Sequence, residues 1–193
     1  MDTVSVIIPA YNAEKTILRA LMSVKKQTYK DFEIVVVDDN STDCTYNIVE
    51  KFRNDNNLNI QIFQSSTGGV SNCRNIGIAH CVGKYVVFLD SDDFYEEDYL
   101  YCLVSAIESG GELVCCNYNT IFEKKSLTSK MKSEVYVCDK NEDSYIDVLE
   151  ENNTFNMVWN KMYILDIIRE NKIVFNEQLT TGEDILFNVD YME

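Results

Sequence analysis

Acidic residues gather at three places where they could do chemistry together. They are Asp38-Asp39, Asp90-Ser91-Asp92-Asp93 and Glu183-Asp184. The first two sets directly follow the apolar runs IVVV and YVVFL. Crowded carboxylates repel one another, so a group of them calls for a cation. Oxygen ligands of this kind select Mg²⁺ or Mn²⁺ rather than zinc.

Apolar runs that alternate with helical periodicity must position these acids. Strands are predicted at Val4–Ile8, Ile34–Val37, Ile60–Phe63, Tyr85–Leu89 and Leu113–Tyr118. Helices are predicted around Ile17–Val24, Ile48–Phe52, Ser71–Cys81 and Leu100–Ile107. Near-continuous apolar strands separated by helices indicate an α/β fold with a mostly parallel sheet covered on both faces. The ligand site of such a sheet lies beyond the carboxyl ends of its strands.

The pattern loosens after residue 120, which predicts a small irregular C-terminal part. We expect a surface loop at Lys124–Lys132 and an edge strand at Val135–Cys138. A short helix is expected at Ser144–Glu150, a longer helix at Trp159–Asn171 and an extended segment at Ile173–Phe175. A last helix is predicted from Glu183 onward and runs into the end of the chain. This uncapped end suggests that the chain is the N-terminal part of something longer.

Length and charge narrow the class of protein. A chain of 193 residues fits one domain with a substantial core. The net charge of −15 opposes nucleic acid as a partner, because phosphate backbones require basic surface. It also opposes unaided adsorption to anionic lipid. An acidic protein that handles an anionic substrate must supply positive charge locally, and a bound metal is one way to do so.

Cysteine and histidine usage exclude several kinds of site. The seven cysteines form no CxxC pair, and their odd number favours reduced, buried thiols over disulfides or zinc. His80 is the only histidine, which opposes a His-based triad, and its place predicts a helix surface. No P-loop motif, signal-peptide pattern or membrane-length apolar stretch is present in the sequence.

Helix capping is the competing interpretation of the acidic clusters. Asp93 with Glu96 fits a capping box, and Ser41-Thr42-Asp43 suits the start of the helix at Thr45–Asn54. Glu183-Asp184 likewise suits a helix N-terminus through the helix dipole. A helix needs one cap, however, so capping does not readily account for Asp38, Asp39, Asp90 and Asp92 together.

Six blocks, in order along nearly the whole chain, resemble family 2 glycosyltransferases. The blocks are VSVIIPAYN, EIVVVDDNSTD, GGVSNCRNIGIA, GKYVVFLDSDD, VWNKMY and GEDILF. The resemblance implies a single GT-A (Rossmann-like) domain over residues 1–193, a nucleoside-diphosphate sugar donor and inversion at the anomeric carbon. It also divides the chain into a nucleotide-sugar-binding half, 1–119, and an acceptor-side and catalytic-base half, 120–193, truncated at its C-terminus.

The resemblance assigns a nucleotide-binding set: Pro9, Tyr11, Asn12, Asp38, Asp39, Arg74, Asp90 and Ser91. One carboxylate of the Asp38-Asp39 pair would read the base, usually uracil, and Asp90 would bond the ribose. Arg74 would contact the nucleotide or steady the acidic cluster, with Cys73 in place of the family's common Ala; a surface Arg is the alternative.

The resemblance also assigns the metal and the catalytic residues. Asp92 would coordinate Mn²⁺ or Mg²⁺ that bridges the diphosphate and neutralises the charge of the leaving group. Asp184 would be the base that deprotonates the acceptor hydroxyl, with Glu183 as the lesser candidate. Trp159 and Lys161 would border the acceptor site, although core packing is favoured for Trp159.

The expected activity is transfer of a sugar from a UDP-sugar to an acceptor hydroxyl in bacterial surface-polysaccharide or glycolipid synthesis. The resemblance places the protein in the cytoplasm, with peripheral association at the inner face of the plasma membrane left open, and suggests a saccharide or lipid-linked acceptor. Two rivals remain: a sugar nucleotidyltransferase and a non-catalytic nucleotide-sugar-binding remnant. PAYNAEKT is a poor substitute for the nucleotidyltransferase's Gly-rich basic loop.

Overall fold

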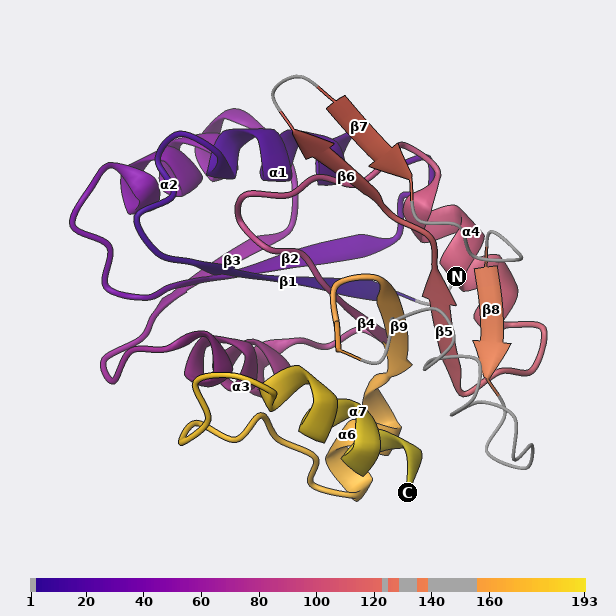
Figure 1. The fold of residues 1–193 in the computed structure, drawn as a ribbon. Coiled ribbons are helices and arrows are strands. Elements are labelled where there is room, and N and C mark those ends of the chain that lie inside the picture. The colour runs from indigo at the N-terminus through magenta and orange to yellow at the C-terminus, as the bar shows by residue number, and fades with distance from the viewer. Residues whose placement is uncertain (1–2, 123–124, 129–134, 139–155) are drawn as a thin grey trace.

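A seven-stranded sheet forms the centre of the computed structural model, which describes residues 3–122, 125–128, 135–138 and 156–193 (Figure 1). The spatial order of the strands is β3-β2-β1-β4-β9-β5-β8. Their bounds are β1 Val4–Ala10, β2 Phe32–Asp38, β3 Ile60–Gln64, β4 Tyr85–Phe88, β5 Leu113–Cys116, β8 Val135–Cys138 and β9 Lys161–Ile164. A separate antiparallel pair joins β6 Asn119–Phe122 to β7 Lys125–Thr128.

Helices cover both faces of this sheet (Figure 1). They are α1 Ile17–Lys25, α2 Thr45–Asp55, α3 Val70–His80, α4 Tyr99–Ile107, α6 Leu165–Glu170 and α7 Glu183–Met192. Ile34 and Val36 of β2 pack into the core cluster that contains α1, α2 and α4. Val35 and Val37 pack into the opposite cluster, with α3, α6 and α7. Burial on both faces explains why the strand sequence is continuously apolar.

Strand directions confirm the predicted α/β class with a mostly parallel sheet. β1 pairs in parallel with β2 and β4, and β2 pairs in parallel with β3. β9 is antiparallel to both β4 and β5, so β5 runs in the same direction as β1. Ala10 and Asp38 are register partners at the carboxyl ends of β1 and β2. The residues that follow these strands therefore meet at one edge of the sheet.

Two expectations for the C-terminal part are wrong. The stretch Trp159–Asn171 is not one helix but strand β9 followed by α6, because Lys161, Met162 and Tyr163 are all buried between β4 and β5. The predicted loop Lys124–Lys132 contains β7. The edge strand Val135–Cys138 is confirmed, and residues 173–175 form no regular element. The helix predicted at 144–150 lies outside the described residues.

The capping interpretation fails for Asp93 and holds in part for Asp43. Helix α4 begins only at Tyr99, and no capping-box bond joins Asp93 to Glu96 among the described residues. Asp43 Oδ1, by contrast, accepts from Thr45 N at the start of α2, at 2.9 Å. Helix capping therefore does not explain why acidic residues occupy the DSDD run.

The six cysteines with described side chains form no disulfide with one another, and Cys73, Cys81, Cys115 and Cys116 are buried. Burial raises the pKa of Cys73 and of Cys116 to about 12, which keeps both thiols protonated. The prediction of buried thiols is confirmed for these four cysteines, whereas Cys44 is exposed and Cys102 is half-buried. Of the helices that the structure describes, none has the length and apolar character needed to cross a membrane.

Candidate active site

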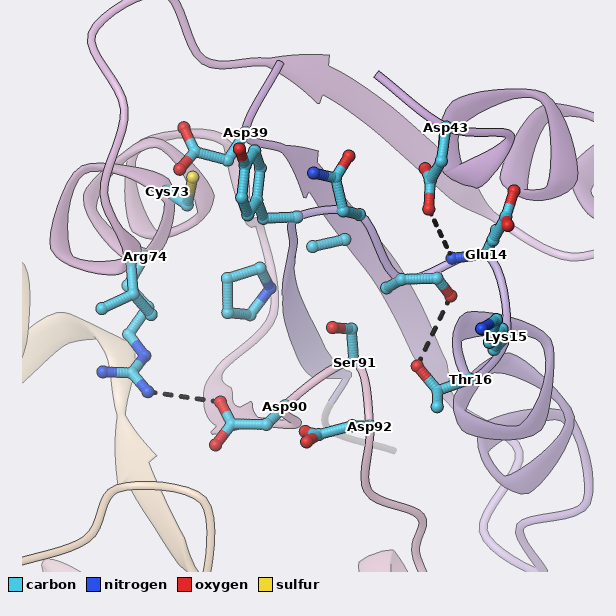
Figure 2. Close-up of a pocket in the computed structure, with 16 residues that line it drawn as sticks. Glu14, Lys15, Thr16, Asp39, Asp43, Cys73, Arg74, Asp90, Ser91 and Asp92 are labelled. Carbon is cyan, nitrogen blue, oxygen red and sulfur yellow. Dashed lines mark hydrogen bonds and ion pairs between the residues drawn. The ribbon is translucent and has the colours of Figure 1, made fainter. Parts of the chain in front are cut away.

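A pocket of about 700 Å³ opens beyond the carboxyl ends of β1, β2 and β4, where the sequence predicts the ligand site (Figure 2). Residues that follow these three strands line it together with the first turns of α3. The pocket brings together eight of the predicted site residues: Pro9, Tyr11, Asn12, Asp39, Arg74, Asp90, Ser91 and Asp92. Residues from four separate stretches of sequence thus meet in one cavity.

The two aspartates at the end of β2 have different places. Asp38 is 1% exposed, does not line the pocket, and accepts a hydrogen bond from Ser41 N through Oδ2 at 3.2 Å. Asp39 lines the pocket and accepts from Gly69 N through Oδ2 at 2.7 Å. The backbone of Gly69 has a φ of 102°, which favours glycine at that position. Asp39 Oδ1 is buried and has no hydrogen-bond partner in the described ranges, so it can accept from a ligand.

Asn12 braces the pocket wall. Its backbone N–H donates to Ser41 Oγ at 3.0 Å, and its Oδ1 accepts from Thr42 N at 2.9 Å. The side-chain oxygen is therefore committed to the neighbouring loop, although the residue was predicted to bind nucleotide. Tyr11, which precedes it, is 62% exposed and open to contact.

The DSDD run places crowded carboxylates at the pocket floor. Burial, together with the negative charges of Asp90 and Asp92, raises the pKa of Asp93. Arg19 donates to the backbone carbonyl of Asp92. Five carboxylates and only two cations line the pocket; they are Glu14, Asp39, Asp43, Asp90, Asp92, Lys15 and Arg74. The described part of the chain brings no three His, Cys, Asp or Glu side chains together as a metal site.

Arg74 links the DSDD run to the acidic pair of α7. Its side chain is 4% exposed, which excludes the predicted alternative of a surface arginine. Nη1 lies 2.6 Å from Asp184 Oδ1 and 3.8 Å from Glu183 Oε1, and Nη2 lies 3.3 Å from Asp90 Oδ1. The dashed line in Figure 2 marks the pair with Asp90. Arg74 thus lies within ion-pair distance of three carboxylates, while its two predicted roles stay predictions.

Asp184 is a buried carboxyl group with a raised pKa. Burial raises its pKa to about 6, the positive charge of Arg74 opposes that rise, and Glu183 and Asp90 add to it. A carboxyl group with this pKa is mostly ionised at neutral pH and can take up a proton there. Neither Asp184 nor Glu183 lines the pocket itself; both reach it through Arg74.

The predicted acceptor-side residues lie in different environments. Trp159 is half-buried, meets the ring of Tyr118 edge-on at 4.9 Å, and lines a second pocket of about 520 Å³. This second pocket shares Asp92 with the first. Lys161 is fully buried, donates from Nζ to Met157 O at 2.6 Å, and lines neither pocket.

Sequence reasoning missed several residues of this region. Glu14, Lys15, Thr16 and Asp43 line the first pocket, and the signal was their position just after predicted strands. Asn75 was also missed, although it follows Arg74 in the quoted block. Its partner, Phe175, is 100 positions away, and no local pattern connects the two.

A pocket beyond the carboxyl ends of parallel strands is the usual place for the ligand site of an open α/β sheet. The profile described as Glycosyl transferase family 2 matches residues 5–171. Poly(ribitol-phosphate) beta-N-acetylglucosaminyltransferase TarS of Staphylococcus aureus (strain MW2) is 32% identical over 187 residues, which cover 96% of this chain and 31% of that protein. Putative glycosyltransferase EpsH of Bacillus subtilis (strain 168) is 30% identical over 187 residues, which cover 96% of this chain and 54% of EpsH. The chain therefore belongs to glycosyl transferase family 2.

Solved structures agree with this membership. The crystal structure of S. aureus TarS 1-349 in complex with UDP-GlcNAc has a TM-score of 0.81 and 30% identity, and the match covers 98% of this chain and 53% of that one. The mannosyltransferase PcManGT of Pyrobaculum calidifontis, in complex with GDP-Man and Mn²⁺, has a TM-score of 0.69 at 21% identity over 94% of this chain and 49% of that one, which shows a shared fold. The chain spans about a third of TarS and about half of EpsH.

Proposed function

We propose that this chain transfers a sugar from a UDP-sugar to an acceptor hydroxyl, with inversion at the anomeric carbon. The observation that carries the proposal is the 2.6 Å pair between Arg74 and Asp184, which fixes a carboxylate of raised pKa beside the acidic loop. UDP-GlcNAc is the first donor to test, because TarS, which is similar over almost the whole of this chain, binds it.

The donor's nucleotide is proposed to bind between Tyr11 and Asp39. The free Oδ1 of Asp39 can accept the imide N–H of uracil, and the exposed ring of Tyr11 can pack on the base. Asp90 and Ser91 lie across the pocket, where Asp90 is proposed to bond the ribose. Residues 1–119 would then hold the donor, and residues 120–193 would supply the base and the acceptor side.

The residues of the first pocket fit a divalent metal. Its excess of carboxylates repels a diphosphate unless a cation intervenes, and Arg74 is already shared among three carboxylates. Mg²⁺ in proteins is commonly held by one or two carboxylates together with substrate phosphates, and Mn²⁺ accepts the same oxygen ligands. Asp92 is proposed as the protein ligand. Such a metal, when bound, would stabilise the negative charge of the leaving diphosphate.

Asp184 is proposed to take the acceptor's proton. As the acceptor oxygen attacks the anomeric carbon, its hydroxyl proton passes to the Asp184 carboxylate, and the bond from the sugar to the diphosphate breaks. One displacement of this kind inverts the anomeric centre. Arg74 holds Asp184 in place, while Glu183, 3.8 Å from Arg74, is the lesser candidate for the base.

The acceptor is proposed to occupy the second pocket. Trp159 and Tyr118 give this pocket an apolar wall, and Asp92 connects it to the donor pocket. Aromatic surface beside polar side chains suits a saccharide, free or lipid-linked, whose apolar faces can pack on the rings. A lipid-linked acceptor would place the protein at the cytoplasmic face of the membrane.

Calorimetry of UDP binding tests the donor assignment. We expect UDP to bind the wild-type protein with Mn²⁺ and to lose most of its affinity with a chelator or in Asp92→Ala, while the exposed control Asp55→Ala binds normally. UDP-GlcNAc is then offered with and without candidate acceptors. UDP release shows a transferase, and binding without turnover indicates a non-catalytic remnant. Pyrophosphate release from a nucleoside triphosphate and a sugar phosphate indicates a nucleotidyltransferase, and absence of UDP binding by a folded protein contradicts the uridine assignment.

A further inference from the structure

Helix α3 is a firmly seated element that serves the donor pocket. Val70, Cys73 and Arg74 line that pocket from its first turns. Further along, Gly77 lies so close to β1 that an added Cβ would meet Ile7 Cγ2 at 2.4 Å. This close approach fixes the helix against the sheet, so side chains on α3 can hold other segments in position.

Asn75, next to Arg74 on α3, makes a paired contact with a distant segment. Its Nδ2 donates to Phe175 O at 2.9 Å, and its Oδ1 accepts from Phe175 N at 2.8 Å. The side-chain amide therefore satisfies both backbone polar groups of Phe175, as a neighbouring strand would do. Asn75 Nδ2 also donates to Glu177 Oε1 at 3.0 Å, and Asn72 Nδ2 donates to the same oxygen at 3.2 Å.

The amide is needed because no described strand pairs with the segment between α6 and α7. Residues 173–176 carry no regular structure, yet Phe175 is 1% exposed. Buried backbone groups without hydrogen-bond partners destabilise the folded protein. Asn75 removes that cost and sets where Phe175 lies.

Phe175 in turn contacts a residue of the helix that carries the proposed base, and also the arginine that pairs with this base. Its ring stacks on Phe187 of α7 at 4.0 Å with an interplanar angle of 5°. The guanidinium of Arg74 lies over the same ring, at 5.2 Å from its centroid. One ring therefore supports the helix that carries Asp184 and the arginine that holds the Asp184 carboxylate.

We propose that Asn75 is a positioning residue for the transfer reaction, acting through Phe175 on Arg74 and Asp184. It touches none of the reacting groups; it fixes the segment against which they are aligned. The inference rests on the proposed role of Asp184 as the base. Misplacement of a reacting group by about 1 Å can lower the rate about a hundredfold. A residue that positions Arg74 and Asp184 indirectly, as Asn75 does, can therefore affect the rate of transfer.

The test compares Asn75→Ala with Asn171→Ala, which removes an exposed asparagine bonded only to the last turn of α6 among the described contacts. Consumption of UDP-GlcNAc gives kcat and KM, and calorimetry gives UDP affinity. We expect Asn75→Ala to lower kcat by about tenfold or more, with UDP affinity within about twofold of wild type. The pH below which the rate falls should also shift in this variant, which loss of stability alone would not cause. Asn171→Ala should behave as wild type.

Hydrogen exchange gives a second readout that needs no turnover. In Asn75→Ala, amides of residues 173–192 should exchange faster, while those of β1 and β2 should not change. Unchanged exchange there, or a loss of kcat matched by an equal loss of UDP affinity, overturns the inference. If Asn75→Ala does not fold, Phe175→Leu keeps an apolar side chain but removes the ring contacts, and the same kinetic and exchange results are expected of it.

Asp184→Asn separates failure of this inference from failure of the proposed function. Turnover that survives in Asp184→Asn overturns the base assignment, and the inference falls with it. Turnover that is lost in Asp184→Asn but kept in Asn75→Ala overturns the inference alone. Loss in both, with UDP binding retained in both, supports the positioning role.

Discussion

Arg74 Nη1 and Asp184 Oδ1 lie 2.6 Å apart, although 110 positions separate them in the chain. The pair connects helix α3, which borders the first pocket, with α7. Because Arg74 also contacts Asp90, one cation serves both the loop proposed to hold the donor and the proposed base. The charge state of one side therefore influences the other.

The rate of sugar transfer should depend on the ionisation of Asp184. Its pKa of about 6 means that the carboxylate is charged, and able to accept a proton, above that pH. We expect kcat to rise with pH and level off above about pH 7, and to fall about tenfold per pH unit well below 6. Asp184→Asn should lower kcat by about 10²–10⁴-fold while UDP still binds, as measured by UDP release and calorimetry.

Glu183→Gln is the matched control for this prediction. The side chain lies farther from Arg74, so we expect a smaller loss of kcat and a retained dependence on pH. A larger loss in Glu183→Gln than in Asp184→Asn would exchange the two roles.

Removal of the Arg74 charge should move the pH profile in a defined direction. The guanidinium lowers the pKa of Asp184 against the effect of burial, so in Arg74→Met that pKa should rise above about 6. The rate should then reach its plateau at a higher pH than in the wild type. The pH profile of Arg74→Lys should lie between those of the wild type and Arg74→Met. A profile that shifts to lower pH, or does not shift in a folded Arg74→Met protein, would contradict the assignment.

Asp39 should dominate recognition of the base. Asp39→Asn keeps the shape of the side chain but makes it a weaker hydrogen-bond acceptor for the imide N–H of uracil. We therefore expect UDP affinity to fall about 10–100-fold. Calorimetry with UDP measures this loss, and the exposed Asp55→Asn should bind as wild type. Equal affinities of the wild-type protein for UDP and CDP would argue against base reading by this carboxylate, because cytosine has no imide N–H.

Gly77 should be intolerant of a side chain. In Gly77→Ala the helix gains about 1 kcal/mol of propensity, but the new Cβ overlaps Ile7 Cγ2, and overpacking costs about 1–3 kcal/mol. We therefore expect a lower free energy of unfolding in urea. The double variant with Ile7→Ala should be more stable than the sum of the single changes predicts, by about 1 kcal/mol. A stabilised Gly77→Ala would show that α3 is not held by this contact.

The first half of the fold could be predicted because its strands are buried on both faces. The runs in β1, β2 and β4 are continuously apolar and have no competing interpretation. β9 could not be predicted in the same way, since it contains Lys161, whose buried ammonium group is satisfied by Met157 O and Asn160 Oδ1. β9 is only four residues long and includes a charged residue, so its sequence does not show the alternation typical of a strand. Its position in the sheet between β4 and β5 depends on contacts distant in sequence.

The site could be predicted where it follows strand ends and not where it depends on tertiary contacts. Asp39 and Asp92 line the pocket because parallel strands bring their carboxyl ends together. The division of labour between Asp38 and Asp39, and the bracing role of Asn12, depend on how neighbouring loops fold. Asn75 required knowledge of which backbone would lie beside α3, and no sequence pattern contains that information.

The placement of β9 bears on how such a domain tolerates change. β4 and β5 are joined through α4, yet β9 lies between them in the sheet, so the chain leaves at Cys116 and returns at Lys161 into the gap. Both ends of this excursion are fixed by the sheet, and residues from Asn117 to Ile121, with Trp159, line the second pocket. We therefore expect exchanges at residues 117–121 and 159 between related chains to alter the second pocket without altering the first, whose lining comes from residues 9–92.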